Sequence, residues 1–168
     1  MKNIISALSK EALLDELTKD RYVRKSNNGN NEIYIITSHN SPNVMREIGR
    51  LRELTFRQAG GGTGKEIDLD EFDICSHPYQ QLLVWDPEFK EIVGAYRYIL
   101  CKDAEFINGK VQLATTELFE FSEDFYKNYL NETIELGRSF IQPAYQPSND
   151  RGKGLFSLLV PPCGYGLH

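Results

Sequence analysis

The chain has 168 residues, of which 40% are hydrophobic and 26% are charged, and its formal net charge is -5. These values are typical of one soluble globular domain that needs no disulfide or metal to stabilise its core, and the negative balance argues against general nucleic-acid binding. No segment approaches the roughly 20 apolar residues of a transmembrane helix, so we expect a cytoplasmic protein whose contact with the inner membrane, if there is any, is peripheral.

The first elements are predicted to be a helix and a strand. Residues 9–20 favour a helix, because leucines repeat on one face and Ser9 can cap its start. A polar turn follows at 26–31. Residues 32–37 (EIYIIT) are β-branched and aromatic, which is typical of a β-strand.

A second helix is predicted to start at Ser41 and Pro42. Serine is a good helix cap, and proline fits the first helical position because its missing N–H has no partner there anyway. The helix should end before Gly60, where glycines begin.

The segment 59–65 (AGGGTGK) resembles a phosphate-binding loop but lacks its spacing. Such a loop needs glycine where this chain has Ala59, and serine or threonine where it has Glu66. We therefore predict a flexible segment that covers a site rather than a nucleotide-binding loop.

The second half of the chain is predicted to be richer in strands. Residues 80–85 and 91–100 indicate a hairpin, 122–130 a short helix, 133–141 another strand, and 142–154 a loop. This mixture of helices and adjacent strands predicts an α/β (α+β) fold with a partly antiparallel sheet.

Six charged residues stand out because their surroundings are otherwise apolar. Charged groups in apolar elements are costly to bury unless they are paired. Two interpretations stay open: an ion-pair network that only holds helix and sheet together, or a functional site. The six residues are Arg52, Asp70, Asp73, Arg97, Glu135 and Arg138.

The spacing of Glu135 and Arg138 predicts an irregularity in the strand if both side chains belong to one site. In a regular strand the two side chains would point to opposite faces. A bulge at Gly137 would bring both to one side and would leave backbone N–H groups that can stabilise an oxyanion.

Four segments in one order carry a family resemblance: 51–56 (LRELTF), 70–73 (DEFD), 94–97 (GAYR) and 135–143 (ELGRSFIQP). Together they resemble the acyl-carrier-dependent branch of the GNAT superfamily. That branch contains acyl-homoserine-lactone synthases and the N-acyltransferases of ornithine and glycine lipids, many of which carry the label hemolysin. The similarity spans residues 31–154 and favours the amino-lipid enzymes.

The resemblance implies a GNAT-like fold and direct acyl transfer without a covalent enzyme intermediate. It implies an acyl-carrier-protein or acyl-CoA donor, an amino-acid acceptor such as glycine or ornithine, no permanently bound cofactor and no metal. By position, it assigns catalysis to Glu135, Arg138 and Arg97, and substrate binding to Arg52, Phe56, Asp70, Asp73 and Ser139.

The roles within this set stay open in part. Glu135 is a candidate general base, provided that burial raises its pKa, or else a structural partner of Arg52 or Arg97. Either Arg138 or Arg97 can bind the acceptor carboxylate through a bidentate hydrogen-bonded contact.

The segment Arg151-Gly152-Lys153-Gly154 stands where GNAT proteins hold the pantetheine phosphate, so the resemblance assigns it to acyl-carrier binding. Glycines permit a close approach of the backbone to an anion. An exposed turn, or contact of Arg151 and Lys153 with an acidic carrier protein, are the alternatives.

After Gly154 the chain departs from the family. We expect one partial GNAT-like domain, with an N-terminal helix and loop at 1–30, a core at 31–154 and an atypical tail at 155–168, in which two prolines prevent a helix. A truncated or frameshifted end would leave a sheet edge exposed, so we expect the isolated chain to form a homodimer or to bind acyl carrier protein weakly.

Two rival functions remain. The first is a homoserine-lactone synthase with S-adenosylmethionine as acceptor. The second is a non-catalytic protein that binds a carrier or lyses membranes, although the chain shows no strong cationic amphipathic helix.

Overall fold

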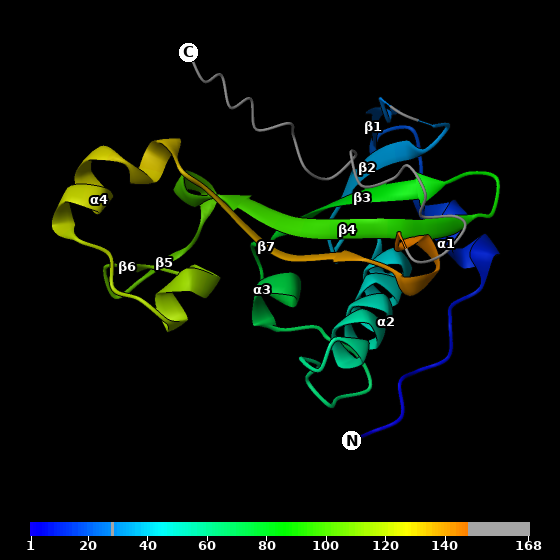
Figure 1. The fold of residues 1–168 in the computed structure, drawn as a ribbon. Helices are drawn as coiled ribbons and strands as arrows, with labels where there is room; N and C mark the ends of the chain where they lie inside the picture. The colour runs from blue at the N-terminus through cyan, green and yellow to red at the C-terminus, as the bar shows by residue number, and fades with distance from the viewer. Residues whose placement is uncertain (28, 148–168) are drawn as a thin grey trace, which may run out of the picture.

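A computed structural model describes residues 1–27 and 29–147, and the structural statements below concern these residues. Its centre is a five-stranded antiparallel sheet in the order β1-β2-β3-β4-β7. Three helices, α1 to α3, lie on one face of this sheet, and α4 forms a lobe with a two-stranded hairpin at one end (Figure 1). The expected mixed α/β fold with a mostly antiparallel sheet is thus confirmed.

The strands of the large sheet are β1 (Tyr22–Lys25), β2 (Glu32–Ile36), β3 (Gln80–Asp86), β4 (Glu91–Leu100) and β7 (Ile134–Ile141), and the small hairpin is β5 (Phe106–Ile107) with β6 (Lys110–Val111). The helices are α1 (Lys10–Glu16), α2 (Pro42–Gln58), α3 (Glu71–Ile74) and α4 (Glu123–Asn128). Short 3₁₀ turns occupy Cys101–Asp103, Ala114–Glu117, Leu130–Glu132 and Pro143–Tyr145.

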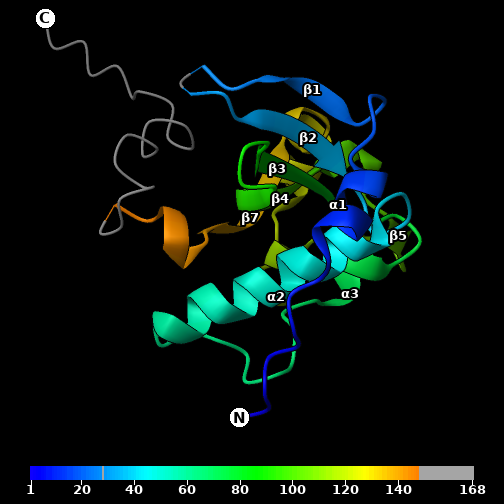
Figure 2. The ribbon, with the colours of Figure 1, turned by 90° about the vertical axis from the view of Figure 1, so that its right-hand side faces the viewer.

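The main hydrophobic core fills the space between the sheet and the pair of helices α1 and α2. Turning the molecule shows α2 running along the underside of the sheet, with α1 beside it (Figure 2). Leu13 of α1, Ile48 and Leu51 of α2, and Leu83 of β3 are all buried in this core. Full burial of each such side chain stabilises the fold by roughly 1.5–3 kcal/mol, so α2 is held firmly against the sheet.

The start of α2 is capped by a residue from α1. Ser41 occupies the cap position as predicted, but its side chain makes no capping hydrogen bond. Instead the carboxylate of Glu16 accepts from the backbone N–H of Asn43 at 3.1 Å and of Val44 at 2.8 Å. A carboxylate at a helix N-terminus satisfies unpaired amides and complements the helix dipole, so α1 anchors α2.

The glycine-rich segment after α2 folds around a buried carboxylate of that helix. Glu53 accepts from the backbone N–H of Thr63 at 2.9 Å and of Gly64 at 2.8 Å, from the Thr63 hydroxyl, and from Arg57. The segment therefore binds an internal anion rather than a phosphate. These bonds tie Thr63 and Gly64 to α2, while the flexibility of the segment and its place over a site stay predictions.

This arrangement predicts a pH-dependent loss of stability. Burial opposes ionisation of Glu53, but hydrogen bonds from Thr63, Arg57 and Gly64 outweigh it and lower its pKa from 4.5 to about 2. Because the folded pKa is the lower one, the stabilisation is complete above pH 4.5 and is lost as the pH falls toward 2.

We therefore expect Glu53→Gln to lower the free energy of unfolding by about 2 kcal/mol at neutral pH. The difference from the wild type should shrink in acid, as urea titrations at several pH values would show. A difference that stays constant down to the acid limit would contradict the role of the ionised carboxylate.

Most predicted elements are confirmed within one to four residues at their ends, including the β3–β4 hairpin and the capping of α1 and α4 by Ser9 and Ser122. The strand β1 was missed because its four residues are all exposed and show no apolar alternation. No helix in the described ranges has the length and apolar character needed to cross a membrane.

Candidate active site

A bulge interrupts the pairing of β4 with β7 at the predicted place. Arg97 lies opposite Gly137 and Ala95 lies opposite Phe140. The one residue between them on β4 therefore faces two residues of β7, Arg138 and Ser139. Of these two, Arg138 has a φ of 50°, in the left-handed region that L residues rarely adopt. The expected bulge is confirmed, but Arg138 rather than Gly137 carries the unusual backbone. Such strain is often kept where function needs it.

The two strands approach each other closely beside the bulge. A Cβ atom at Gly94 of β4 would lie 2.4 Å from the carbonyl oxygen of Phe140 on β7. Any larger residue at position 94 would therefore push β7 away. The absence of a side chain there helps to fix the place of Arg138, two residues before Phe140.

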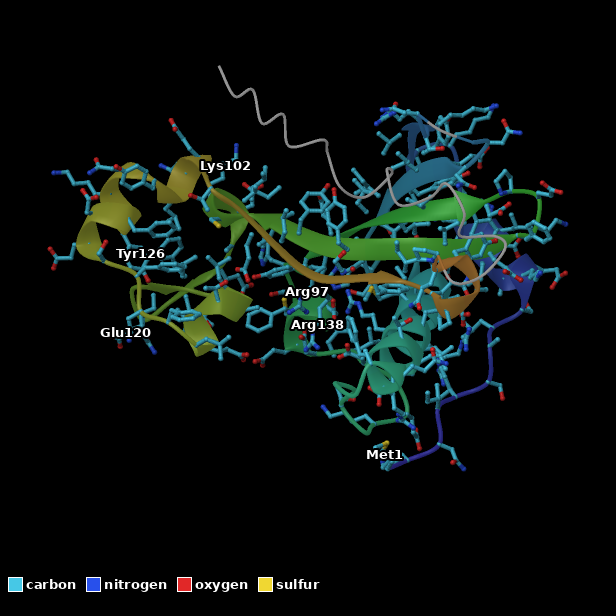
Figure 3. The ribbon with its side chains drawn as sticks, in the orientation of Figure 1. Met1, Arg97, Lys102, Glu120, Tyr126 and Arg138 are labelled. Atoms are coloured by element: carbon cyan, nitrogen blue, oxygen red, sulfur yellow. The ribbon has the colours of Figure 1, made fainter. Side chains whose placement is uncertain are left out.

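The charged residues meet in one cluster between the sheet and helices α2 and α3. Figure 3 shows the labelled Arg97 and Arg138 next to each other beneath β4 and β7. Their contacts divide the set into a buried half and an open half. We define the charged cluster as Arg52, Asp68, Asp70, Asp73, Gln81, Arg97 and Arg138.

The buried half ties α2, α3 and the sheet together. Arg52 donates to Asp73 at 2.9 Å and to Gln81 at 2.6 Å, and none of these three side chains is exposed. Gln81 lies opposite Arg97 in the β3–β4 pair and donates to Asp73 at 3.1 Å. In this structure Arg52 and Asp73 thus support the site from within, as the ion-pair interpretation expected.

The open half centres on Asp70 and reaches solvent through Asp70 and Arg138. Its carboxylate accepts two hydrogen bonds from Arg97, at 2.6 and 2.7 Å, and a third from Arg138 at 3.3 Å. Arg138 also donates to Asp68 at 3.2 Å and keeps 34% of its side chain exposed, against 5% for Arg97. Arg138 is therefore the guanidinium of the cluster that a small molecule can reach.

The environment shifts the acidities of the two open-half carboxyl groups in opposite directions. Burial disfavours the charged form of Asp70, but the hydrogen bonds and charges of Arg97 and Arg138 outweigh it and lower its pKa. For Asp68 burial prevails over the attraction of Arg138, and its pKa is raised.

Glu135 lies beside the cluster in its own hydrogen-bond network. One oxygen accepts from the Tyr79 hydroxyl at 2.8 Å, and the other accepts from the backbone N–H and hydroxyl of Thr115 at 3.1 and 2.9 Å. Arg97 stacks over the Tyr79 ring at 5.1 Å and so connects this network to the charged cluster.

The alternative prediction, that Glu135 is a structural partner of Arg52 or Arg97, is therefore wrong. Arg52 and Arg97 pair with Asp73 and Asp70, not with Glu135. Burial and the hydrogen bond to Glu135 raise the pKa of the Tyr79 hydroxyl, so Tyr79 stays a neutral donor. The role of Glu135 as a general base stays a prediction.

The remaining predicted residues are more scattered. Phe56 packs against the main hydrophobic core from α2, one turn after Arg52, and Ser139 is exposed on the bulge. The segment 151–154 lies outside the described residues. Sequence reasoning missed Asp68, Tyr79, Gln81 and Thr115; only Gln81, a polar residue inside an apolar strand, gave a usable signal.

An antiparallel sheet with a bulged strand, flanked by helices, agrees with the GNAT-like fold that the sequence predicted. The chain matches the acetyltransferase (GNAT) domain family over residues 51–151, more than half of its length, and belongs to that family. No solved structure matches it.

Two curated relatives have names that are more specific than the description of the family. The chain is 57% identical over 159 residues to a glycine N(alpha)-acyltransferase of Bacteroides thetaiotaomicron and 54% identical over 159 residues to one of Phocaeicola vulgatus. Each match covers 94% of this chain, but 47% and 49% of the relatives. The chain thus spans about half the length of the curated relatives it matches.

Proposed function

We propose that the protein transfers an acyl group from a thioester to the amine of glycine. The names of the two relatives give glycine as the acceptor, and the identities of 57% and 54% support a shared acceptor. The observation that carries the proposal in this chain is the partly exposed Arg138 in the open half of the charged cluster. A guanidinium in that place can bind the carboxylate of an amino acid.

The chemistry needs few groups from the protein. The amine attacks the thioester carbonyl, the carbon–nitrogen bond forms, and the carbon–sulfur bond breaks to release a thiol. A bulge takes a residue out of the regular ladder, and we propose that backbone N–H groups near the bulge of β7 stabilise the oxyanion of the tetrahedral intermediate. No cysteine or serine nucleophile is required.

The proposal also names the acyl donor and the pathway that uses the product. We propose acyl carrier protein as the donor's carrier, with acyl-CoA as the alternative, and amino-lipid synthesis as the use of the product. The family resemblance supports both. Ornithine as acceptor, contact with the membrane surface, a cytoplasmic location and a homodimer stay predictions.

A product assay tests the proposed function. The chain is incubated with acyl-carrier-protein thioesters or with acyl-CoA, and with glycine, ornithine or S-adenosylmethionine. Mass spectrometry should detect an N-acylglycine. A lactone product would favour the homoserine-lactone synthase, and the absence of any acylated product together with lysis of red cells would favour the non-catalytic alternative.

A further inference from the structure

We propose that Asp68 accepts the proton of the attacking amine and forms, with Arg138, a site that binds both charges of a zwitterionic amino acid. This assignment rests on the proposed function and adds a residue to it. The family resemblance does not assign Asp68 a role.

The four carboxylates in and beside the cluster differ in how many donors they bind. Asp70 and Asp73 accept hydrogen bonds on both oxygens, mainly from the arginines and from Gln81. Glu135 also accepts on both oxygens. Each hydrogen bond to a carboxylate favours the charged form and so weakens it as a base.

Asp68 accepts fewer hydrogen bonds than the other three carboxylates. The described hydrogen bond to its side chain is the one from Arg138, to a single oxygen at 3.2 Å. The side chain is only 2% exposed, so little water is available to solvate it. A carboxylate that is desolvated and weakly hydrogen-bonded is the better proton acceptor.

The charged groups that face Asp68 come from three sides and act on its pKa in opposite directions. Arg138 on β7 and Arg52 on α2 favour its charged form, whereas Asp70 and Asp73 oppose it. Burial outweighs the arginines and raises the pKa of Asp68 above its usual range. The carboxylate is thereby closer in basicity to the amine nitrogen from which it must take a proton.

Arg138 and Asp68 contact each other directly, so groups bound by the two side chains lie close together. The bonds of Arg138 to Asp68 and Asp70, at 3.2 and 3.3 Å, are longer than the bonds that fix Arg97 on Asp70. A substrate carboxylate can replace them on the exposed guanidinium. The amine of glycine, two bonds from its carboxylate carbon, then lies within reach of Asp68.

Helix α2 fixes the position of Asp68. The backbone N–H of Asp68 donates to the carbonyl of Gly49 at 3.0 Å. A Cβ atom at Gly49 would lie 2.8 Å from the Leu69 side chain, so the lack of a side chain in the middle of α2 lets the 68–69 segment lie directly against the helix.

In the proposed step Asp68 takes one proton from the bound ammonium group, which frees the nitrogen lone pair to form the bond to the carbonyl carbon, and Asp68 later passes this proton to solvent. The carbon–sulfur bond then breaks, and the leaving thiolate takes up the second proton, which the nitrogen loses as the amide forms. The products are an amide, a thiol and one proton released to solvent, with no oxidant or further reactant needed.

Asp68→Asn is the decisive variant, measured on the full chain with the acyl thioester and glycine. We expect kcat to fall by about 10²–10⁴-fold, KM for glycine to rise because the ammonium loses its partner, and the slope of log kcat against pH on the acid side to fall by about one. Asp68→Glu should recover part of kcat. Circular dichroism and thermal midpoints show that each variant is folded.

Glu135→Gln separates the two candidate bases. If Asp68 is the proton acceptor, this variant keeps the acid side of the wild-type pH profile. A wild-type kcat and pH profile in Asp68→Asn, or loss of the acid limb in Glu135→Gln alone, would overturn the assignment. A wild-type chain that acylates no amino acid would instead overturn the proposed function itself.

Discussion

Replacing Arg52 with methionine should lower the free energy of unfolding by about 3–5 kcal/mol. Methionine keeps much of the length of the side chain but removes the charge that neutralises Asp73 and the donor that Gln81 accepts from. Asp73 would remain fully buried, with the partial compensation of Arg97 at 3.4 Å. Urea unfolding at neutral pH measures the effect.

A surface pair supplies the control for this experiment. Lys10 lies 3.3 Å from Glu91, with 48% of its side chain exposed. Solvent-exposed pairs contribute about 0–1 kcal/mol, so Lys10→Ala should change stability little. If Arg52→Met were no more destabilising than Lys10→Ala, the buried half of the charged cluster would not stabilise the fold as described.

Arg138→Gln should raise KM for glycine by about 10–100-fold, because a charge-assisted hydrogen bond to the acceptor carboxylate contributes roughly 1.5–3 kcal/mol. The KM for the acyl donor should stay close to the wild-type value. Stability should change less than in Arg52→Met, since 34% of the Arg138 side chain is exposed. Initial rates at varied glycine and fixed donor concentrations measure the two constants.

Arg24→Gln is a matched control for the loss of an arginine. Arg24 is exposed on β1, the opposite edge of the sheet, where its contacts are to Lys25 and Asn27. Its kinetic constants should equal those of the wild type. A KM for glycine that rises equally in both variants would indicate a general effect of charge rather than a contact with the acceptor.

Local sequence patterns predicted the elements well where one strong local signal was present. Ser9 and Ser122 cap the helices that follow them, and the bulge next to Gly137 appears where the alternation of Glu135 and Arg138 required it. The two caps depend on neighbouring residues alone, which a sequence displays directly.

The site was predictable only in part, because its pairings join distant segments. Nothing around Arg52 indicates that its partners are Asp73 and Gln81, which are 21 and 29 residues away. Likewise the cap of α2 comes from Glu16, so the local Ser41 signal pointed to the right position but the wrong side chain. Tertiary contacts decide such cases.

The charged cluster contains as many guanidinium groups as carboxylates. Arg52, Arg97 and Arg138 balance Asp68, Asp70 and Asp73, and their contacts of 2.6–3.4 Å are much shorter than the screening length of about 8 Å at physiological ionic strength. Salt therefore should not loosen them, and at longer range their fields largely cancel. Glycine is also electrically neutral as a zwitterion, so its capture should be insensitive to added salt. Any salt dependence of turnover would then report on the encounter with the acyl donor, which we propose is an acyl carrier protein.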